Sequence, residues 1–152
     1  MTVVEALRSQ NTEALKSLLE SDNSLATKKD ERGFTPLILA TYFGNHDAAE
    51  AILSFNPDID SKDASGNTAL MGVCFKGDFK LAQLLIDNGA DINIQNNEGG
   101  TALSFASTYG KNDLVKLLLD NGAQKDVKDN NGKTAIELAA ANGHSQIVEA
   151  LK

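Results

Sequence analysis

One set of residues recurs every 33 positions along most of this 152-residue chain. Two glycines, eleven residues apart, and a threonine mark each repeat, and no insertion breaks the register from residue 30 onward. Such a period is typical of supersecondary units that stack side by side, because one unit alone cannot bury its apolar face. The recurring positions are Gly33, Gly66, Gly99 and Gly132, then Thr35, Thr68, Thr101 and Thr134, then Gly44, Gly77, Gly110 and Gly143.

The 33-residue repeat divides a single domain, residues 1–152, into five units. The first unit carries weaker marks, but its leucines Leu15, Leu18 and Leu19 align with the apolar rows of the later units. The two outer units are incomplete, as expected for units that face water on one side. We place the units at residues 1–29, 30–62, 63–95, 96–128 and 129–152.

Local signals predict two short helices in each unit. Thr35 before Pro36 is typical of a helix start, because the hydroxyl caps a free backbone N–H and proline fits the first helical position. Gly44 and its equivalents end this first helix, since glycine adopts positive φ readily. A second apolar-faced helix ends at another glycine, or at Asn56 in unit two. Segments such as 96–99 then predict a hairpin turn.

These marks resemble the ankyrin repeat. The segment Thr35-Pro36-Leu37-Ile38-Leu39-Ala40 is similar to the family's T-P-L-H-x-A signature. Residues 89–93 resemble the family's turn between repeats. The resemblance covers essentially the whole chain and implies an all-α fold, an ankyrin-repeat solenoid of helix-turn-helix units joined by β-hairpin-like loops. The chain also looks like the small stand-alone ankyrin proteins of bacteria.

Two departures from the family pattern are informative. The signature histidine is replaced in every unit, by Ile38, Met71, Ser104 and Glu137. Gly72 stands where other units carry Leu39, Phe105 and Leu138. We expect Gly72 to leave a void, or to let a large side chain such as Phe105 or Leu39 lean in; Phe43 is a further candidate to fill the space.

The residues do not indicate an enzyme. His46 and His144 belong to different units of a linear stack, so they should not share a metal ion or a catalytic triad; we expect them to cap helices or face solvent. Cys74 aligns with small residues and is interpreted as a packed side chain. The glycine loops lack the phosphate-binding pattern, and the carboxylates occupy turn positions. We therefore predict no catalytic residues, cofactor or metal.

Composition and charge narrow the class of partner. The formal charge is −7, and the largest basic cluster is Lys28, Lys29 and Arg32, so a nucleic-acid partner is not expected. No run is apolar enough for a membrane span, no secretory signal is visible, and a single cysteine fits a reducing compartment, so we expect a cytoplasmic protein. An elongated array suggests a monomer. The alternative is weak self-association through an apolar edge formed by Ile147, Val148 and Leu151.

The resemblance implies a protein-binding surface. In the family, partners usually meet the concave face, which is made by hairpin tips and the exposed part of the first helices. Five of the eight aromatic residues map to such positions, whereas Phe79 and Phe105 map to inward positions and are expected in the core. The alternative is structural: Tyr42 and Phe75 would stack as an apolar ladder. The candidate protein-binding residues are Glu31, Arg32, Phe34, Tyr42, Phe43, Phe75, Lys76 and Tyr109.

The predicted function is a protein–protein interaction module that acts as an adaptor or scaffold. Units two and three carry more acids than bases, which favours a partner with apolar side chains flanked by Lys or Arg. The alternative is a one-to-one regulatory inhibitor of an enzyme or toxin. Both functions would use the same surface, so the sequence does not separate them.

Overall fold

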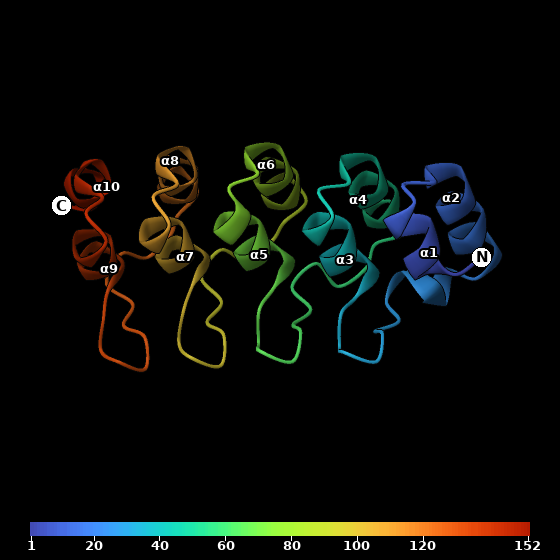
Figure 1. Ribbon diagram of the computed structural model, residues 1–152, viewed down its shortest axis with the longest axis horizontal. Helices are drawn as coiled ribbons and strands as arrows, with labels where there is room; N and C mark the ends of the chain where they lie inside the picture. The colour runs from blue at the N-terminus through green and yellow to red at the C-terminus, as the bar shows by residue number, and fades with distance from the viewer.

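The computed structural model describes residues 1–152 and shows a row of five helix pairs (Figure 1). Hairpin loops project from one edge of the row, and the two termini lie at opposite ends. The prediction of an all-α repeat solenoid is confirmed, and no segment forms a regular strand. The elements are α1 (Val3–Arg8), α2 (Thr12–Ser21), the 3₁₀ turn η1 (Asn23–Ala26), α3 (Pro36–Tyr42), α4 (His46–Leu53), α5 (Ala69–Lys76), α6 (Phe79–Asp87), α7 (Ala102–Thr108), α8 (Asn112–Asp120), α9 (Ala135–Ala141) and α10 (Ser145–Leu151).

The helices form two rows. The first helices contact one another in the order α1, α3, α5, α7, α9, and the second helices in the order α2, α4, α6, α8, α10. Each helix is short, between 6 and 10 residues, and would be marginal in isolation. Contacts between neighbouring units therefore hold the helices in place.

Threonine begins the first helices as predicted. Thr35, Thr68 and Thr101 each accept a hydrogen bond from the backbone N–H three residues on, at 3.1, 3.3 and 3.2 Å. Thr134 differs, because its hydroxyl donates to the Glu137 carboxylate at 3.1 Å. Asn56 adopts the left-handed conformation after α4 (φ 52°), which confirms its predicted role in place of glycine.

The core runs through the whole row as one cluster of 31 buried residues. Both rows supply its large members: Leu7, Leu37, Leu70 and Leu103 from the first helices, and Leu15, Leu19, Ile52, Leu81, Leu85, Leu114 and Leu118 from the second helices. Cys74 is fully buried, which confirms its interpretation as a packed side chain. Ile147 and Leu151 are buried too, so the last unit shows less apolar edge than the sequence suggested.

The expectation that Phe79 belongs to the core is wrong. Phe79 is the first residue of α6, and its side chain is 40% exposed. Polar residues occupy the aligned position in the other units, namely His46, Asn112 and Ser145, and this signal identifies the position as outward-facing. Phe105, by contrast, is half-buried and packs against the core.

Asparagine side chains link the later hairpin tips. Asn97 donates its backbone N–H to the Ser65 carbonyl (3.1 Å) and its side-chain amide to the Ala64 carbonyl (3.0 Å). Asn130 repeats the pattern one unit later, with Glu98 and Asn97 as acceptors. The corresponding residue of unit three is Ala64, and no hydrogen bond ties the unit-two tip to the unit-three tip.

Candidate protein-binding face

The eight candidate residues all lie on the hairpin loops and first helices, which we call the candidate face. Glu31 and Arg32 are exposed at the tip of the unit-two hairpin. Phe34 is half-buried between that hairpin and α3. The others lie at the C-terminal ends of first helices: Tyr42 ends α3 and Phe43 follows it, Phe75 and Lys76 end α5, and Tyr109 follows α7.

Three aromatic side chains of this face are strongly exposed. Tyr42 is 61% exposed, Phe75 47% and Tyr109 48%, and they belong to three consecutive units. Only Met1 and Phe79 are comparably exposed among the large apolar residues elsewhere in the chain. Grouped exposed apolar surface marks an interaction site more often than scattered single residues do.

The aromatic contacts differ from the predicted ladder. The Phe75 ring packs edge-on against Tyr109, with centroids 4.7 Å apart, and against Phe105 at 6.5 Å. The Tyr42 ring packs against Phe43 at 5.6 Å. Tyr42 and Phe75 therefore do not stack on each other, because Phe75 turns toward unit four.

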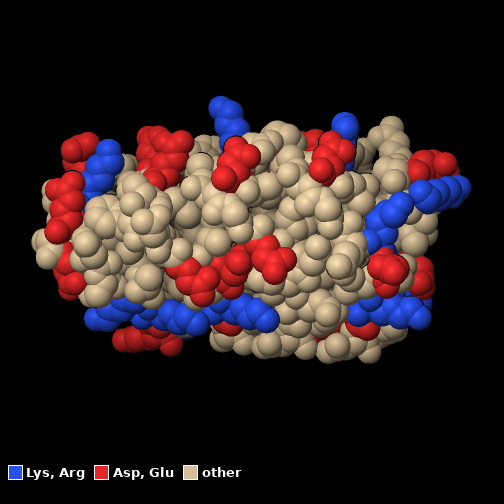
Figure 2. All heavy atoms as spheres, turned by 180° about the vertical axis from the view of Figure 1, so that it is seen from behind, with Lys and Arg blue, Asp and Glu red and all other residues tan.

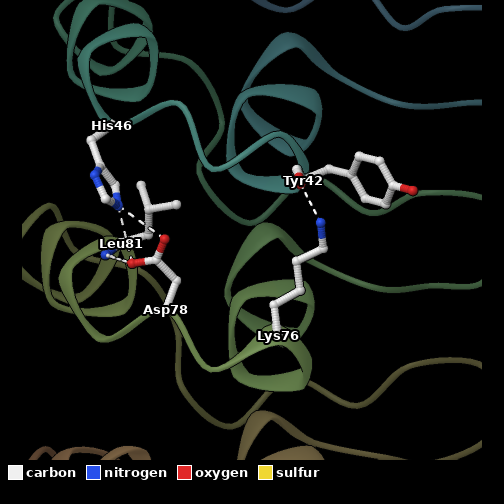
Figure 3. Close-up of polar contacts among 5 residues, drawn as sticks. All are labelled: Tyr42, His46, Lys76, Asp78 and Leu81. Carbon is white, nitrogen blue, oxygen red and sulfur yellow. Dashed lines mark hydrogen bonds and ion pairs between the residues drawn. The ribbon is translucent and has the colours of Figure 1, made fainter.

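Figure 3 shows two of the polar contacts that join units two and three. The Lys76 ammonium donates to the Tyr42 carbonyl and lies 3.9 Å from the centroid of its ring. In the second-helix row, His46 Nε2 lies 2.9 and 3.1 Å from the carboxylate oxygens of Asp78. One of these oxygens also accepts the Leu81 N–H at 3.1 Å and so caps α6.

The histidines serve as contacts between units. His46 is exposed beside Asp78, whereas His144 Nε2 donates to the Thr108 carbonyl at 3.0 Å. His144 is also the residue before α10, but its side chain makes no capping hydrogen bond there. Each histidine therefore ties its own unit to a neighbour, in different parts of the array.

Gly72 opens a hollow in the candidate face. The hollow has a volume of about 350 Å³ and is lined by Gly72, Ile38, Met71, Phe75 and Phe105, among others. A Cβ atom added at Gly72 would meet no heavy atom within 4 Å. The predicted void is confirmed, and Phe105 lines it without filling it.

The other two residues considered for this space lie elsewhere. Leu39 is buried, and Phe43 lines a different hollow of about 280 Å³ beside Arg8, Arg32 and Tyr42. A third hollow, of about 420 Å³, lies between α7 and α9 and contains Glu98 and Asp129. The candidate face is therefore hollowed at three places along the row.

Sequence reasoning missed several residues that line these hollows. Ile38 and Met71 stand at the signature histidine position. An apolar residue at this position was a sequence signal that the surface here differs from the family pattern. Arg8 and Asp129 come from neighbouring units, one on α1 and one in a later hairpin. A pattern read one unit at a time does not reveal that they join the same face.

The acids of units two and three are mostly directed away from the candidate face. Asp47 and Glu50 lie on α4, and Asp78 and Asp87 lie on α6, all in the second-helix row. Asp63 is an exception, because it lines the Gly72 hollow; one of its carboxylate oxygens accepts two backbone N–H groups of its own turn at 2.9 Å. The net charge of a unit is therefore a poor guide to the charge of its binding surface.

Asp30 shows how these turn carboxylates are held. Its carboxylate accepts the backbone N–H groups of Arg32 and Phe34, each at 2.9 Å. Burial raises the pKa of Asp30, but these hydrogen bonds and the Arg32 guanidinium at 3.6 Å outweigh it, so the pKa lies below its usual value. The lowered pKa favours the charged carboxylate, whose hydrogen bonds hold the hairpin turn.

Basic side chains follow the hairpin edge. From behind, Figure 2 shows Lys and Arg gathered near the edge from which the hairpins project, with acids spread over the helices above. At the bases of the hairpins, the Lys29 ammonium donates to the Lys62 carbonyl at 2.9 Å, and Lys62 donates to the Gln95 carbonyl at 3.1 Å. The net charge of −7 is thus unevenly distributed.

The described residues show few features of reactive chemistry. Burial raises the pKa of the Cys74 thiol to about 12, which disfavours the nucleophilic thiolate. No group of three or more His, Cys, Asp or Glu side chains is arranged to hold a metal ion. None of the helices combines the length and apolar character that crossing a bilayer requires.

A family model described as ankyrin repeats (3 copies) matches residues 3–96 and again residues 70–152. The chain belongs to the ankyrin-repeat family. Ankyrin repeats are generally protein–protein interaction modules and typically non-catalytic. A comparison with curated proteins found no significant match. The candidate face of this ankyrin-repeat protein combines three exposed aromatic side chains with three hollows.

Proposed function

We propose that this ankyrin-repeat protein binds a partner protein through the candidate face and acts as an adaptor or scaffold. The observation that carries the proposal is the row of three exposed aromatic side chains, Tyr42, Phe75 and Tyr109, on consecutive units. Aromatic side chains bury a large area with few rotatable bonds, and they are enriched among the residues that dominate binding energy.

The remaining candidate residues have supporting roles in this proposal. Phe34 and Phe43 are half-buried and form walls of the hollows beside Tyr42. Glu31 and Arg32 extend from a hairpin tip that is not tied to the next one, so this tip is free to adjust to a partner. Lys76 contributes a cation next to the exposed Tyr42 ring.

The proposed partner presents apolar side chains together with Lys or Arg. The apolar side chains would pack on the exposed aromatics, and the cations would meet Glu31, Glu98 and Asp129. Charge complementarity of this kind accelerates association more than it increases affinity. We further propose that the protein works as a monomer in a reducing compartment such as the cytoplasm, since its one cysteine is free.

The test compares two sets of aromatic side chains. The full chain, a Tyr42→Ala/Phe75→Ala variant and a Phe79→Ala variant would each be used as bait, and proteins bound to them identified by mass spectrometry. Phe79 is the matched control, because it is an exposed aromatic outside the candidate face. Circular dichroism would establish that all three proteins keep the same helix content.

The identified partner would then be purified and titrated against each protein. We expect the double variant to bind at least about thirtyfold more weakly than the wild type, the size of effect seen at hot-spot residues. Phe79→Ala should bind normally. Unchanged affinity in the folded double variant would refute the proposed face. An assay of the partner's own activity, with and without this protein, would separate an adaptor from an inhibitor.

A further inference from the structure

The three hollows of the candidate face differ in their charge, and their lining residues place them in a fixed order along the row of first helices. Figure 1 shows the order of these helices. The first, which we call the arginine hollow, lies between α1 and α3. It is lined by Arg8 and Arg32 and by no acid, and the Arg32 guanidinium also lies 3.6 Å from the Asp30 carboxylate just outside it. The second is the glycine hollow over Gly72, which is lined by one acid, Asp63, and one base, Lys76. The third is the carboxylate hollow between α7 and α9, which contains Glu98 and Asp129 but no Lys or Arg.

The glycine hollow is open because one unit lacks a side chain that its siblings have. Leu39, Phe105 and Leu138 occupy the aligned positions, whereas Gly72 leaves an exposed helix surface with no heavy atom within 4 Å of its missing Cβ. The volume of about 350 Å³ falls within the range of about 300–1,000 Å³ that is common for ligand pockets. A leucine-sized or aromatic side chain from outside therefore fits where this unit has none.

The walls of the glycine hollow are held in place by contacts already described. Phe75 is supported by Tyr109 and Phe105 on one side, and Tyr42 is covered by Lys76 on the other (Figure 3). At the junction between α5 and α7, the Phe75 ring packs against the Phe105 and Tyr109 rings between the glycine hollow and the carboxylate hollow. A bound apolar side chain would meet a preformed site, which lowers the cost of binding.

We infer that the candidate face holds one extended segment of its partner, in which an acidic residue, a large apolar residue and a Lys or Arg follow in that order along the array. The inference rests on the proposed function and specifies the partner's chemistry. The acidic residue would meet Arg8 and Arg32, the apolar residue would fill the glycine hollow, and the basic residue would meet Glu98 and Asp129.

The spacing of the hollows sets the spacing of these residues. Packed helices lie about 8–10 Å apart, and an extended chain advances about 3.3 Å per residue. One junction separates the arginine hollow from the glycine hollow, which corresponds to about three residues of the segment. Two junctions separate the glycine hollow from the carboxylate hollow, which corresponds to about five or six residues.

Free amide groups beside the hollows favour an extended segment over a helix. The side-chain amide nitrogen of Asn67, beside the glycine hollow, has no hydrogen-bond partner within the chain. The side chain of Asn131, beside the carboxylate hollow, is unpaired as well. An extended segment offers backbone N–H and C=O groups for such amides, whereas a helix satisfies its own.

The inference is tested by selecting binders from a displayed library of random twelve-residue peptides with the full-length protein. We expect enrichment of peptides that carry the three residue types in one fixed order, at the two spacings derived above. Peptides with no common order, peptides whose spacings fit a helix, or failure to select any binder would overturn the inference.

Two variants then link the peptide's residues to the hollows. Gly72→Leu fills the glycine hollow with the residue found at the aligned positions of units two and five, and should weaken the selected peptide at least about tenfold. Lys80→Leu, which adds a leucine to exposed α6, should leave peptide binding unchanged. Urea unfolding would establish that both variants are at least as stable as the wild type.

The second variant, Glu98→Lys with Asp129→Asn, reverses the charge of the carboxylate hollow. Asparagine is chosen because Asn96 occupies the aligned position in unit four and accepts the same two backbone N–H groups. We expect at least about tenfold weaker binding of the selected peptide and recovery when its basic residue is replaced by Glu. If neither variant changes binding while Tyr42→Ala/Phe75→Ala still abolishes capture of the partner, the ordered segment is refuted and the proposed function stands.

Discussion

The Lys76 ammonium lies 3.9 Å from the centroid of the Tyr42 ring and donates to the carbonyl of the same residue, one unit away. Two residues of the candidate face are therefore also part of the junction between units two and three. Substitutions there act on stability as well as on binding, so the two effects have to be measured separately.

The Lys76 contact should make a small contribution to stability. We expect Lys76→Met to lower the free energy of unfolding by about 0.5–1 kcal/mol, because the substitution keeps most of the aliphatic stem and removes an exposed cation–π contact. Lys80→Met is the control, since Lys80 is exposed on α6 and makes no ion pair or hydrogen bond. Urea unfolding of the two variants decides the matter: equal stabilities would mean that the contact contributes nothing.

Asp78 should matter more than its histidine partner. Its carboxylate both caps α6 and pairs with His46, so Asp78→Ala should lower the free energy of unfolding by about 1–2 kcal/mol. Asp78→Asn keeps a good cap and removes only an exposed ion pair, which is worth about 1 kcal/mol or less. A double-mutant cycle with His46→Ala measures the pair directly. Equal losses for Asn and Ala would show that capping is not the main role of Asp78.

Much of the fold was predictable because its signals are local and repeated. The threonine caps depend on a hydroxyl and an N–H three residues apart, and Asn56 depends on the conformational preference of a single residue. Neither signal needs knowledge of distant contacts. Four copies in register then made an otherwise weak local pattern specific.

The chemistry of the candidate face was less predictable, because it depends on which unit each neighbour comes from. The charge of unit two gave no indication that Asp47 and Glu50 face away, or that Arg8 from unit one joins Arg32. Phe79 was misplaced because its position was mapped as inward-facing, whereas the polar residues at the aligned positions indicated exposure. Comparing a position across units was more informative than the residue type alone.

Replacement by alanine should change the stability of the protein in opposite directions at two glycines of unit three. Gly72 lies in the interior of α5 with free space around it, so Gly72→Ala should raise the free energy of unfolding by about 0.5–1 kcal/mol. Gly66 has φ +80°, and an added Cβ would lie 2.8 Å from the backbone nitrogen of Asn97. Gly66→Ala should therefore lower the free energy of unfolding by more than about 1 kcal/mol. Thermal or urea unfolding measures both, and two changes of the same sign would contradict this reasoning.

Cys74 should make stability fall in alkaline solution. Burial raises the pKa of its thiol to about 12 from an ordinary value of 9.0, so the unfolded chain releases a proton that the folded chain keeps. Above pH 9 the unfolded state therefore binds fewer protons, and the free energy of unfolding decreases as pH rises toward 12. The full contribution is present below pH 9 and is progressively lost above it.

The control for this effect is Cys74→Ala, because alanine occupies the aligned position in unit five as Ala140. Other groups also titrate in alkaline solution, but they do so in both proteins, so the difference between wild type and variant isolates the thiol. We expect this difference in the free energy of unfolding to change by about 1.4 kcal/mol per pH unit once the pH exceeds 9. A difference that stays constant from pH 7 to about pH 10.5 would mean that the thiol ionises without cost in the folded protein.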